Sequence, residues 1–382
     1  MVNEIECLNN NYSTTRLCYK LLDDKYLDEN GKIKEEFKFK LNFPEFEIVD
    51  SKISAKENEK FDTYLFLPEG EGRKGEGGLR TRGYFKFSYK KVDSEWYVAG
   101  SNSEKIKKIE LPITNYPLQT THYPLITIIT VVYNGEKYLE ETILSVINQT
   151  YPNVEYIIID GGSTDGTLDI IKKYEDKIDY WVSEKDKGIY DAMNKGIDLA
   201  SGEWINFMNA GDKFYDEKVL EKIFLKKNIR NYKIIYGDVE TTYDSFNIIH
   251  KTGNLNNLYK GMQFSHQSTF FDVAYHKRNK YNINFDLSAD FLNIVSLYAK
   301  EGVKVFYYIS YPFSSVNTDG VSEKQIFNSV FQHWKAVQYI KKSNFLINLY
   351  YIFSLLKQYI KTKFLNQKVL NLYRKIKYKV YK

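Results

Sequence analysis

Residues 125–165 read LITIITVVYNGEKYLEETILSVINQTYPNVEYIIIDGGSTD, and this stretch decides the fold. It begins with an apolar, β-branched run at 125–132, which is typical of a parallel strand buried on both faces. Residues 136–148 follow with apolar side chains near helical spacing, and 154–159 read as a second buried strand. A strand, a helix and a strand joined by short loops predict a βαβ unit in an open α/β sheet.

The alternation continues beyond this unit. We expect strands at 179–183 and 203–208, and helices at 166–174, 189–200 and 216–224, with Ser163 or Thr164 capping the first of these helices. Ligands of open α/β sheets bind beyond the carboxyl ends of the strands. Four consecutive strand ends carry polar residues and glycines, namely 133–134, 160–162, 183–187 and 209–212. Neighbouring strand ends of this kind predict one shared crevice.

The residue types in this crevice suit a nucleoside diphosphate with a divalent ion. Tyr133 offers an aromatic face for a flat ring, and Asp160 can accept hydrogen bonds from a base or ribose. Lys187 lies where a helix begins, which favours a phosphate. Asp212 offers a carboxylate that can hold Mg²⁺ or Mn²⁺ together with phosphate oxygens.

Each of these residues also has a purely structural interpretation. Tyr133 is one of 34 tyrosines and can be an ordinary core residue. Asp160 can cap the turn that follows it, and Asp212 can be the N-cap of the next helix. The joint pattern, rather than any single member, favours the binding site.

The net charge hides a division of the chain. The 382 residues include Lys+Arg 54 and Asp+Glu 49, a formal charge of +5. Residues 324–382 contain thirteen of the Lys and Arg and no Asp or Glu, so the preceding part is acidic. Such asymmetry predicts an anionic surface or partner for the tail. An aromatic content of 16% excludes a disordered chain.

Other classes of protein are excluded by simple features. The two cysteines, Cys7 and Cys18, are too few for a disulfide framework or a cysteine metal site. Residues 1–12 lack a basic start and an apolar core, so we expect no signal peptide there.

Three regions follow from the changes in pattern. Residues 1–120 predict a small β-rich domain of unreadable role, with strands near 61–67 and 84–89. Between these runs, residues 70–75 match G-x-G-x-x-G, but more glycines and a strand-like run follow instead of a helix, so we interpret them as a flexible hairpin loop. Residues 121–322 form the α/β domain, and 323–382 form a basic helical tail.

The tail shows two apolar stripes at helical spacing, one in 326–340 and one in 345–364. Its longest uncharged run, 343–356, is shorter than the roughly 20 residues that span a bilayer. We therefore expect 343–382 to lie on an anionic membrane surface, which makes the protein peripheral on the cytoplasmic face. The alternative is a packing helix with a solvated basic end. Nucleic acid is a third option for the tail, and the acidic body argues against it.

The motifs PLITIITVVYNGEKYLEETILSVINQTYPNVEYIIIDGGSTDGT, SEKDKGIYDAMNKGI and GEWINFMNAGD resemble a family 2 glycosyltransferase of the GT-A fold. The resemblance is dense over 124–215 and thinner to about 320. It implies an inverting, Mn²⁺- or Mg²⁺-dependent enzyme that transfers a sugar from a nucleotide diphosphate donor, typically a UDP-sugar, to an acceptor hydroxyl. The acceptor that the resemblance implies is a glycan or a lipid-linked acceptor in bacterial surface-polysaccharide or capsule biosynthesis.

Residue by residue, the resemblance implies donor-side roles. Tyr133 matches the aromatic that stacks on the base. Asp160 and Gly161 match a pair of aspartates, of which the second often reads the base and is glycine here. Asn209 and Asp212 match the ends of the metal motif, and Asp212 is the expected metal ligand.

The resemblance also implies roles on the acceptor side. Asp290 matches the general base, with Asp286 as its rival and a helix-dipole carboxylate as its structural alternative. His266 and Gln267 match a stretch that lines the acceptor side, although His266 can equally be a structural histidine. Two other functions remain open: a non-catalytic nucleotide- or saccharide-binding module, and transfer to a lipid phosphate.

Overall fold

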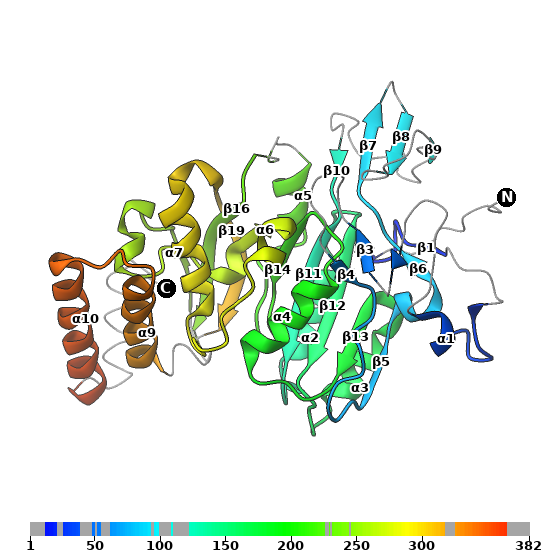
Figure 1. Cartoon of the computed structure of the whole chain (residues 1–382), viewed down its shortest axis with the longest axis horizontal. Helices are drawn as coiled ribbons and strands as arrows, with labels where there is room; N and C mark the ends of the chain where they lie inside the picture. Colours follow the sequence, from blue (N-terminus) through cyan, green and yellow to red (C-terminus); the bar gives the residue numbers. More distant parts are fainter. Residues whose placement is uncertain are drawn as a thin grey trace.

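The computed structural model describes residues 12–20, 26–38, 48–49, 52–54, 62–92, 95–98, 108–109, 122–225, 229, 231–243, 246–317 and 325–364. Its centre is a mixed, open sheet (Figure 1). The strand order is β15 (Lys213–Phe214), β19 (Phe306–Asn317), β16 (Ile234–Tyr243), β18 (Thr269–Asp272), β14 (Trp204–Phe207), β11 (Ile126–Val132), β12 (Val154–Asp160), β13 (Tyr180–Ser183) and β5 (Gly75–Gly77), while β17 (Phe246–His250) pairs with β16.

Four parallel strands form the part of the sheet that carries the predicted crevice. β11 lies between β12 and β14, and β13 follows β12. Val132, Asp160 and Ser183 are in register at the carboxyl ends of β11, β12 and β13. The predicted open α/β sheet is therefore confirmed, and three predicted loops start from one edge of it.

Helices cover both faces of this sheet, which explains why β11 and β12 are apolar at nearly every position. Ile129 and Val131 of β11 belong to one buried cluster, whereas Ile128 and Val132 belong to the other. The first cluster includes residues of α4 (Ile189–Leu199), α6 (Val273–Arg278) and α7 (Ala289–Glu301). The second includes residues of α2 (Leu139–Ile147), α3 (Thr167–Lys173) and α5 (Val219–Phe224).

Residues 70–74 of the glycine-rich segment form a loop, as predicted, but the loop does not close a hairpin, because Gly75 begins a strand of the main sheet. Residues of β5 pair antiparallel with β13, and η2 (Leu79–Arg82), a 3₁₀ helix, follows. The hairpin prediction was wrong because the partner strand lies about a hundred residues away, and no local pattern encodes such a pairing. Gly78, between β5 and η2, has φ 102 and would bring a Cβ against the backbone of Ile178 and Asp179, so glycine is required there.

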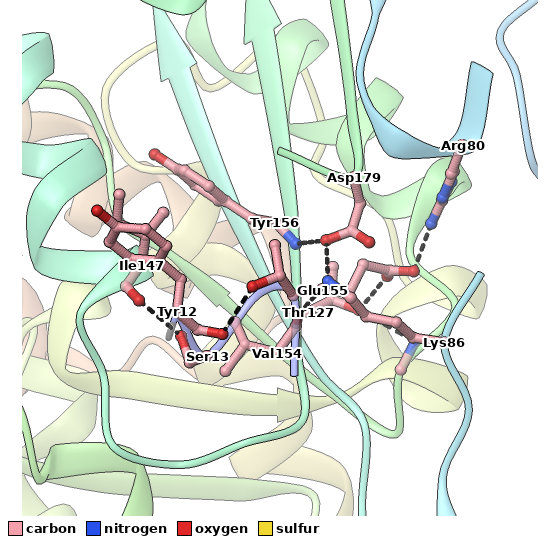
Figure 2. A network of polar contacts seen from close by, with 12 residues as sticks. Tyr12, Ser13, Arg80, Lys86, Thr127, Ile147, Val154, Glu155, Tyr156 and Asp179 are labelled. Atoms are coloured by element: carbon pink, nitrogen blue, oxygen red, sulfur yellow. Dashed lines mark hydrogen bonds and ion pairs between the residues drawn. The ribbon is translucent and has the colours of Figure 1, made fainter. Parts of the chain in front are cut away.

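Two buried ion pairs fasten this N-terminal segment to the sheet. Arg80 pairs with Glu155 of β12, and Lys86 Nζ lies 2.6 Å from Asp179 Oδ2, just before β13. Figure 2 shows both pairs in one network, together with Ser13, which donates to the Ile147 carbonyl at 3.1 Å. Segments that precede the α/β region are thus packed into it.

The other described N-terminal elements are short, and most are strands, as predicted. The prediction of a separate domain ending at residue 120 stays a prediction. β7 (Tyr89–Val92), β8 (Glu95–Val98), β9 (Lys108–Ile109) and β10 (His122–Tyr123) form a sheet that stands at one end of the molecule (Figure 1). The remaining elements are β1 (Tyr19–Lys20) with β6 (Tyr84–Phe85), β2 (Ile48–Val49) with β3 (Lys52–Ser54) and β4 (Asp62–Tyr64), and α1 (Glu35–Lys38).

The C-terminal part is helical, as predicted. α9 (Ile326–Tyr339) and α10 (Phe345–Phe364) lie side by side at the opposite end from β7 and β8 (Figure 1). Trp334 of α9 stacks on Tyr351 of α10 with ring centroids 6.2 Å apart and donates to Asn348 Oδ1 at 2.7 Å. Within the described residues, neither α10 nor any other helix combines the length and apolar character needed to cross a membrane.

Candidate active site

The loops after β11 and β12 are joined by hydrogen bonds from backbone N–H groups to side-chain oxygens. The Asn134 backbone N–H donates to Ser163 Oγ at 2.7 Å, and the Thr164 N–H donates to Asn134 Oδ1 at 2.8 Å. Asn134 has φ 50, a left-handed conformation that asparagine tolerates. The predicted capping of the next helix is wrong: α3 begins at Thr167 after Gly166 without a side-chain cap, because Ser163 is used between the loops.

Asp160 is fully buried at the carboxyl end of β12. Its Oδ2 accepts from the Ser163 N–H at 3.0 Å and from Ser183 Oγ at 2.5 Å. Ser163 Oγ donates to the other carboxylate oxygen. The Asp160 carboxylate therefore joins the ends of β12 and β13 and the loop between β12 and α3.

Tyr133, Gly161 and Asp186 come together beyond the carboxyl ends of β11, β12 and β13. The Tyr133 side chain is 66% exposed, so the core interpretation of this residue is wrong. A Cβ built on Gly161 would overlap Asp186 Oδ2 and would lie 3.4 Å from Tyr133 Cδ2. The Asp186 carboxylate thus occupies the volume that a side chain at position 161 would need.

Lys187 is exposed beside the start of α4. Its backbone N–H donates to Asp191 Oδ2 at 2.9 Å, and Gly188, with φ 111, turns the chain into the helix. Lys187 thus lies two residues before the first residue of α4, at the helix start that the sequence predicted.

Asp212 lies in the turn after β14, where its N–H donates to the Asn209 carbonyl at 2.9 Å. Burial raises the pKa of the Asp212 carboxyl to about 6, against the opposing effects of Gln267 and His266. Gln267 Nε2 donates to Asp212 Oδ2 at 2.9 Å. A carboxylate with a raised pKa is stabilised in its charged form by a cation.

Asn209, in the same turn as Asp212, offers a second side-chain oxygen. Its Oδ1 is buried and has no hydrogen-bond partner in the part of the chain that is described. Within the same residues, no three His, Cys, Asp or Glu side chains gather into a metal-binding cluster. One carboxylate and one unpaired amide oxygen nevertheless fit Mg²⁺ or Mn²⁺, which take oxygen ligands and fill the rest of the shell with phosphate and water.

Asp290 lies in the first turn of α7 with both carboxylate oxygens in use. Tyr190 OH donates to Oδ1 at 2.8 Å, and His266 Nδ1 lies 3.3 Å from Oδ2. Burial raises the pKa of Asp290, but His266 and Tyr190 outweigh burial and hold that pKa below its ordinary value. For His266, burial lowers the pKa, but the nearby Asp290 and Asp212 raise it by more. The pKa of His266 therefore lies above its ordinary value. Asp290 is therefore ionised at neutral pH.

Asp286, the rival for the same role, points elsewhere. It is exposed and accepts from Gln332 Nε2 of α9. Asp290 rather than Asp286 thus contacts the residues of the crevice.

Two consecutive side chains connect the predicted metal ligand with the predicted base. His266 and Gln267 lie in η5 (His266–Ser268), where Gln267 reaches Asp212 and His266 reaches Asp290. Asn206 Nδ2 donates to the Gln267 carbonyl at 2.9 Å and thereby fixes η5 against β14. η5 thus contacts the Asp212 carboxylate through one side chain and the ionised Asp290 carboxylate through the preceding one.

Sequence reasoning missed Tyr190 and Asp186. Both lie in the quoted motif SEKDKGIYDAMNKGI, but their partners are distant in sequence. For Asp186 there was a signal, since the glycine at position 161 leaves a gap beside an aromatic residue. Tyr190 offered none.

Comparisons with known proteins agree on the family. The model described as "Glycosyl transferase family 2" matches residues 127–296. The putative teichuronic acid biosynthesis glycosyltransferase TuaG of Bacillus subtilis is 41% identical over 107 residues, which cover 27% of this chain and 42% of that protein. A PGL/p-HBAD biosynthesis glycosyltransferase of Mycobacterium tuberculosis is 35% identical over 121 residues, which cover 30% of this chain and 47% of that protein.

Among solved structures, TarS 1–349 of S. aureus in complex with UDP is similar with a TM-score of 0.47 and 16% identity, covering 65% of this chain and 78% of that chain. The mannosyltransferase PcManGT of Pyrobaculum calidifontis, in complex with GDP-Man and Mn²⁺, has a TM-score of 0.44 and 16% identity, covering 69% of this chain and 82% of that chain. Residues 127–296 of this chain are therefore similar to family 2 glycosyltransferases. The match covers less than half the length of TuaG and of the mycobacterial relative.

Proposed function

We propose that this protein is an inverting, metal-dependent glycosyltransferase that moves a sugar from a nucleotide diphosphate donor to an acceptor hydroxyl. The observation that carries the proposal is the link through η5, in which Gln267 contacts Asp212 and His266 contacts Asp290. A site that only bound a nucleotide would use Asp212 to hold the cation, but it would not need a second, ionised carboxylate such as Asp290. The family of residues 127–296 supports the same reaction class.

The donor would bind along the carboxyl ends of the strands. Tyr133 would stack on the base, and the absence of a side chain at Gly161 lets the Asp186 carboxylate lie close to the ring. Lys187 and the start of α4 would attract the diphosphate. We assign Asp160 the role of a positioning residue, because its carboxylate is buried and holds the loop that begins with Gly161.

Asp212 and Asn209 would hold Mn²⁺ or Mg²⁺. When bound, such an ion neutralises negative charge that builds up on a leaving diphosphate. Oδ2 of Asp212 accepts the hydrogen bond from Gln267, and Oδ1 would bind the cation. Gln267 thereby orients the carboxylate toward the donor.

Asp290 would act as the general base of a single displacement. The acceptor oxygen forms a bond to the anomeric carbon, the bond from that carbon to the diphosphate oxygen breaks, and Asp290 receives the acceptor's proton. Each carboxylate oxygen has a second lone pair beyond the one used by Tyr190 or His266, so it can still accept this proton. Tyr190 and His266 would position the carboxylate.

The test is a screen of the purified protein against nucleotide sugars with Mn²⁺, read by release of nucleotide diphosphate. We expect one donor to be turned over, with loss of turnover in EDTA and in the Asp212→Asn variant. Equal, metal-independent release by both proteins would contradict the proposal. No release from any nucleotide sugar, with nucleotide binding retained, would favour a non-catalytic binding module.

The acceptor is proposed to be a glycan or lipid-linked glycan in surface-polysaccharide biosynthesis. TuaG is named for teichuronic acid biosynthesis, and the mycobacterial relative is named for PGL/p-HBAD biosynthesis. Analysis of the glycosylated product distinguishes a hydroxyl acceptor from a lipid phosphate, because a glycosyl phosphate is cleaved by mild acid.

We propose that α10 holds the enzyme on the cytoplasmic face of an anionic membrane. One face of α10 packs on α9 through Tyr351, which is buried. The rest of the helix exposes a dense apolar surface next to Lys357, Lys361 and Lys363, a composition that suits an interfacial helix. The exposed apolar residues are Phe345, Leu346, Leu349, Tyr350, Ile352, Phe353, Leu356, Tyr359 and Ile360.

Vesicle cosedimentation tests this proposal. We expect wild type to sediment with phosphatidylserine-containing vesicles at low salt, and the Leu346→Ser/Phe353→Ser variant to stay in the supernatant. Val303→Ser is the matched control, because Val303 is also more than half exposed but lies outside α10. Undiminished sedimentation of the double variant would contradict the proposal.

A further inference from the structure

The space above Gly161 is filled by a side chain from another strand end. Asp186 follows β13, and its Oδ2 lies where a Cβ of residue 161 would stand. The same position is 3.4 Å from the exposed ring of Tyr133. A carboxylate therefore borders the ring on which the proposed function would stack a base.

The two oxygens of Asp186 differ in their surroundings. Oδ1 accepts from the Gly188 N–H at 2.8 Å, which fixes the side chain. Oδ2 has no hydrogen-bond donor among the residues that the structure describes, and it is not among the buried unpaired atoms. A fixed carboxylate with one available oxygen can accept a hydrogen bond from a ligand.

The charged neighbours of Asp186 leave this oxygen available. Burial raises the pKa of Asp186, and the nearby groups are Lys195, Asp191 and Asp160. Lys195 Nζ is held by Glu184 Oε1 at 2.7 Å, and Asp160 is saturated by Ser163 and Ser183. The nearest cation is thus engaged with Glu184.

We propose that Asp186 reads the base of the donor nucleotide in place of a side chain at position 161. The inference rests on the proposed function and deepens it. Oδ2 would accept the imino N–H of a base stacked on Tyr133, which selects uracil, thymine or guanine. Cytosine and adenine carry an acceptor nitrogen at the equivalent position, and a carboxylate repels it. The donor is thus a nucleoside diphosphate sugar whose base has an imino N–H.

Calorimetric titration of UDP, GDP, CDP and ADP with Mn²⁺ tests the inference. A hydrogen bond to a charged group predicts that UDP or GDP binds at least about tenfold more tightly than CDP and ADP. In Asp186→Asn, Oδ1 keeps the contact with the Gly188 N–H, and the Nδ2 group that faces the base can donate to the acceptor nitrogen of cytosine or adenine but cannot accept an imino N–H. We expect this preference to fall to within about threefold.

A relocation of the carboxylate sharpens the test. Asp186→Ser keeps an oxygen for Gly188 but should lose the preference for UDP or GDP. The double variant Gly161→Asp/Asp186→Ser should regain this preference, because a carboxylate then lies beside Tyr133 again, supplied by the loop after β12. Asp176→Asn, an exposed carboxylate in η3 (Glu175–Lys177) paired with Lys177, is the matched control and should keep the wild-type preference.

The outcomes separate this inference from the proposed function. A wild-type preference that persists in Asp186→Asn, or tightest binding of CDP or ADP by the wild type, would overturn the role of Asp186 alone. If the wild type bound none of the four nucleotides, both the proposed function and this inference would be overturned. Restored preference for UDP or GDP in Gly161→Asp/Asp186→Ser supports both the role of Asp186 and the proposed function.

Discussion

Replacement of Arg80 by methionine should destabilise the protein strongly. Arg80 and Glu155 form an ion pair in which both side chains are 3% exposed. The Arg80 guanidinium also donates to the carbonyls of Leu65 at 3.2 Å and Leu199 at 3.1 Å. Glu155 accepts further bonds from Thr127 Oγ1 at 2.6 Å and the Ser201 N–H at 2.9 Å (Figure 2 shows the Glu155 network).

The size of the effect follows from burial. Removal of one partner of a buried ion pair leaves an uncompensated charge and costs about 3–5 kcal/mol of unfolding free energy. Burial alone would raise the pKa of Glu155, and Arg80 is the largest influence that lowers it. Arg82 lies in the same 3₁₀ helix, but it is 39% exposed and 3.7 Å from Glu175, so Arg82→Met should cost less than about 1 kcal/mol.

Urea unfolding followed by circular dichroism measures both variants. Arg80→Met/Glu155→Met should recover much of the loss, because it removes both charges and fills the space with apolar atoms. Equal stability of Arg80→Met and Arg82→Met would refute the reasoning. It would also refute the view that the N-terminal segment is part of the folding unit of the α/β region.

Three further predictions concern the site. Asp212→Asn should abolish the enhancement of UDP binding by Mn²⁺ while leaving metal-free binding unchanged, as measured by titration with and without EDTA. Tyr133→Ala should weaken UDP binding by about tenfold, because base stacking on an aromatic ring contributes about 1–3 kcal/mol, whereas Tyr138→Ala should not. The pKa of Asp212 is raised to about 6, so protons compete with the cation below that pH, and Mn²⁺-dependent binding should fall by up to about tenfold per pH unit between pH 6 and 5, but not between pH 8 and 7.

Much of the sheet could be predicted because its strands are locally encoded. The run at 125–132 is apolar at nearly every position, and β11 is buried throughout. By contrast, β5 contains the sequence Gly-Glu-Gly and is a strand only because β13 offers it an edge. Long-range pairing of this kind has no local signature.

The contacts of the candidate site also differ in how far the sequence predicts them. Tyr133 and Asp212 lie at strand ends, so their convergence follows from the order of the parallel strands. The contact of Asp290 with Tyr190 depends on how α7 packs against α4, which no motif specifies. The approach of Asp186 to Gly161 likewise appears only when the loops after β12 and β13 are built side by side.

The most direct test of the account compares wild type and Asp290→Asn with the donor found in the screen. Asparagine keeps the shape of the side chain but is a far poorer proton acceptor. We predict that transfer to acceptor falls by about 10²–10⁴-fold while the donor affinity stays within about threefold of wild type. Wild-type transfer rates in Asp290→Asn would contradict the assignment of this carboxylate as the base, and with it the central claim of a catalytic site across η5.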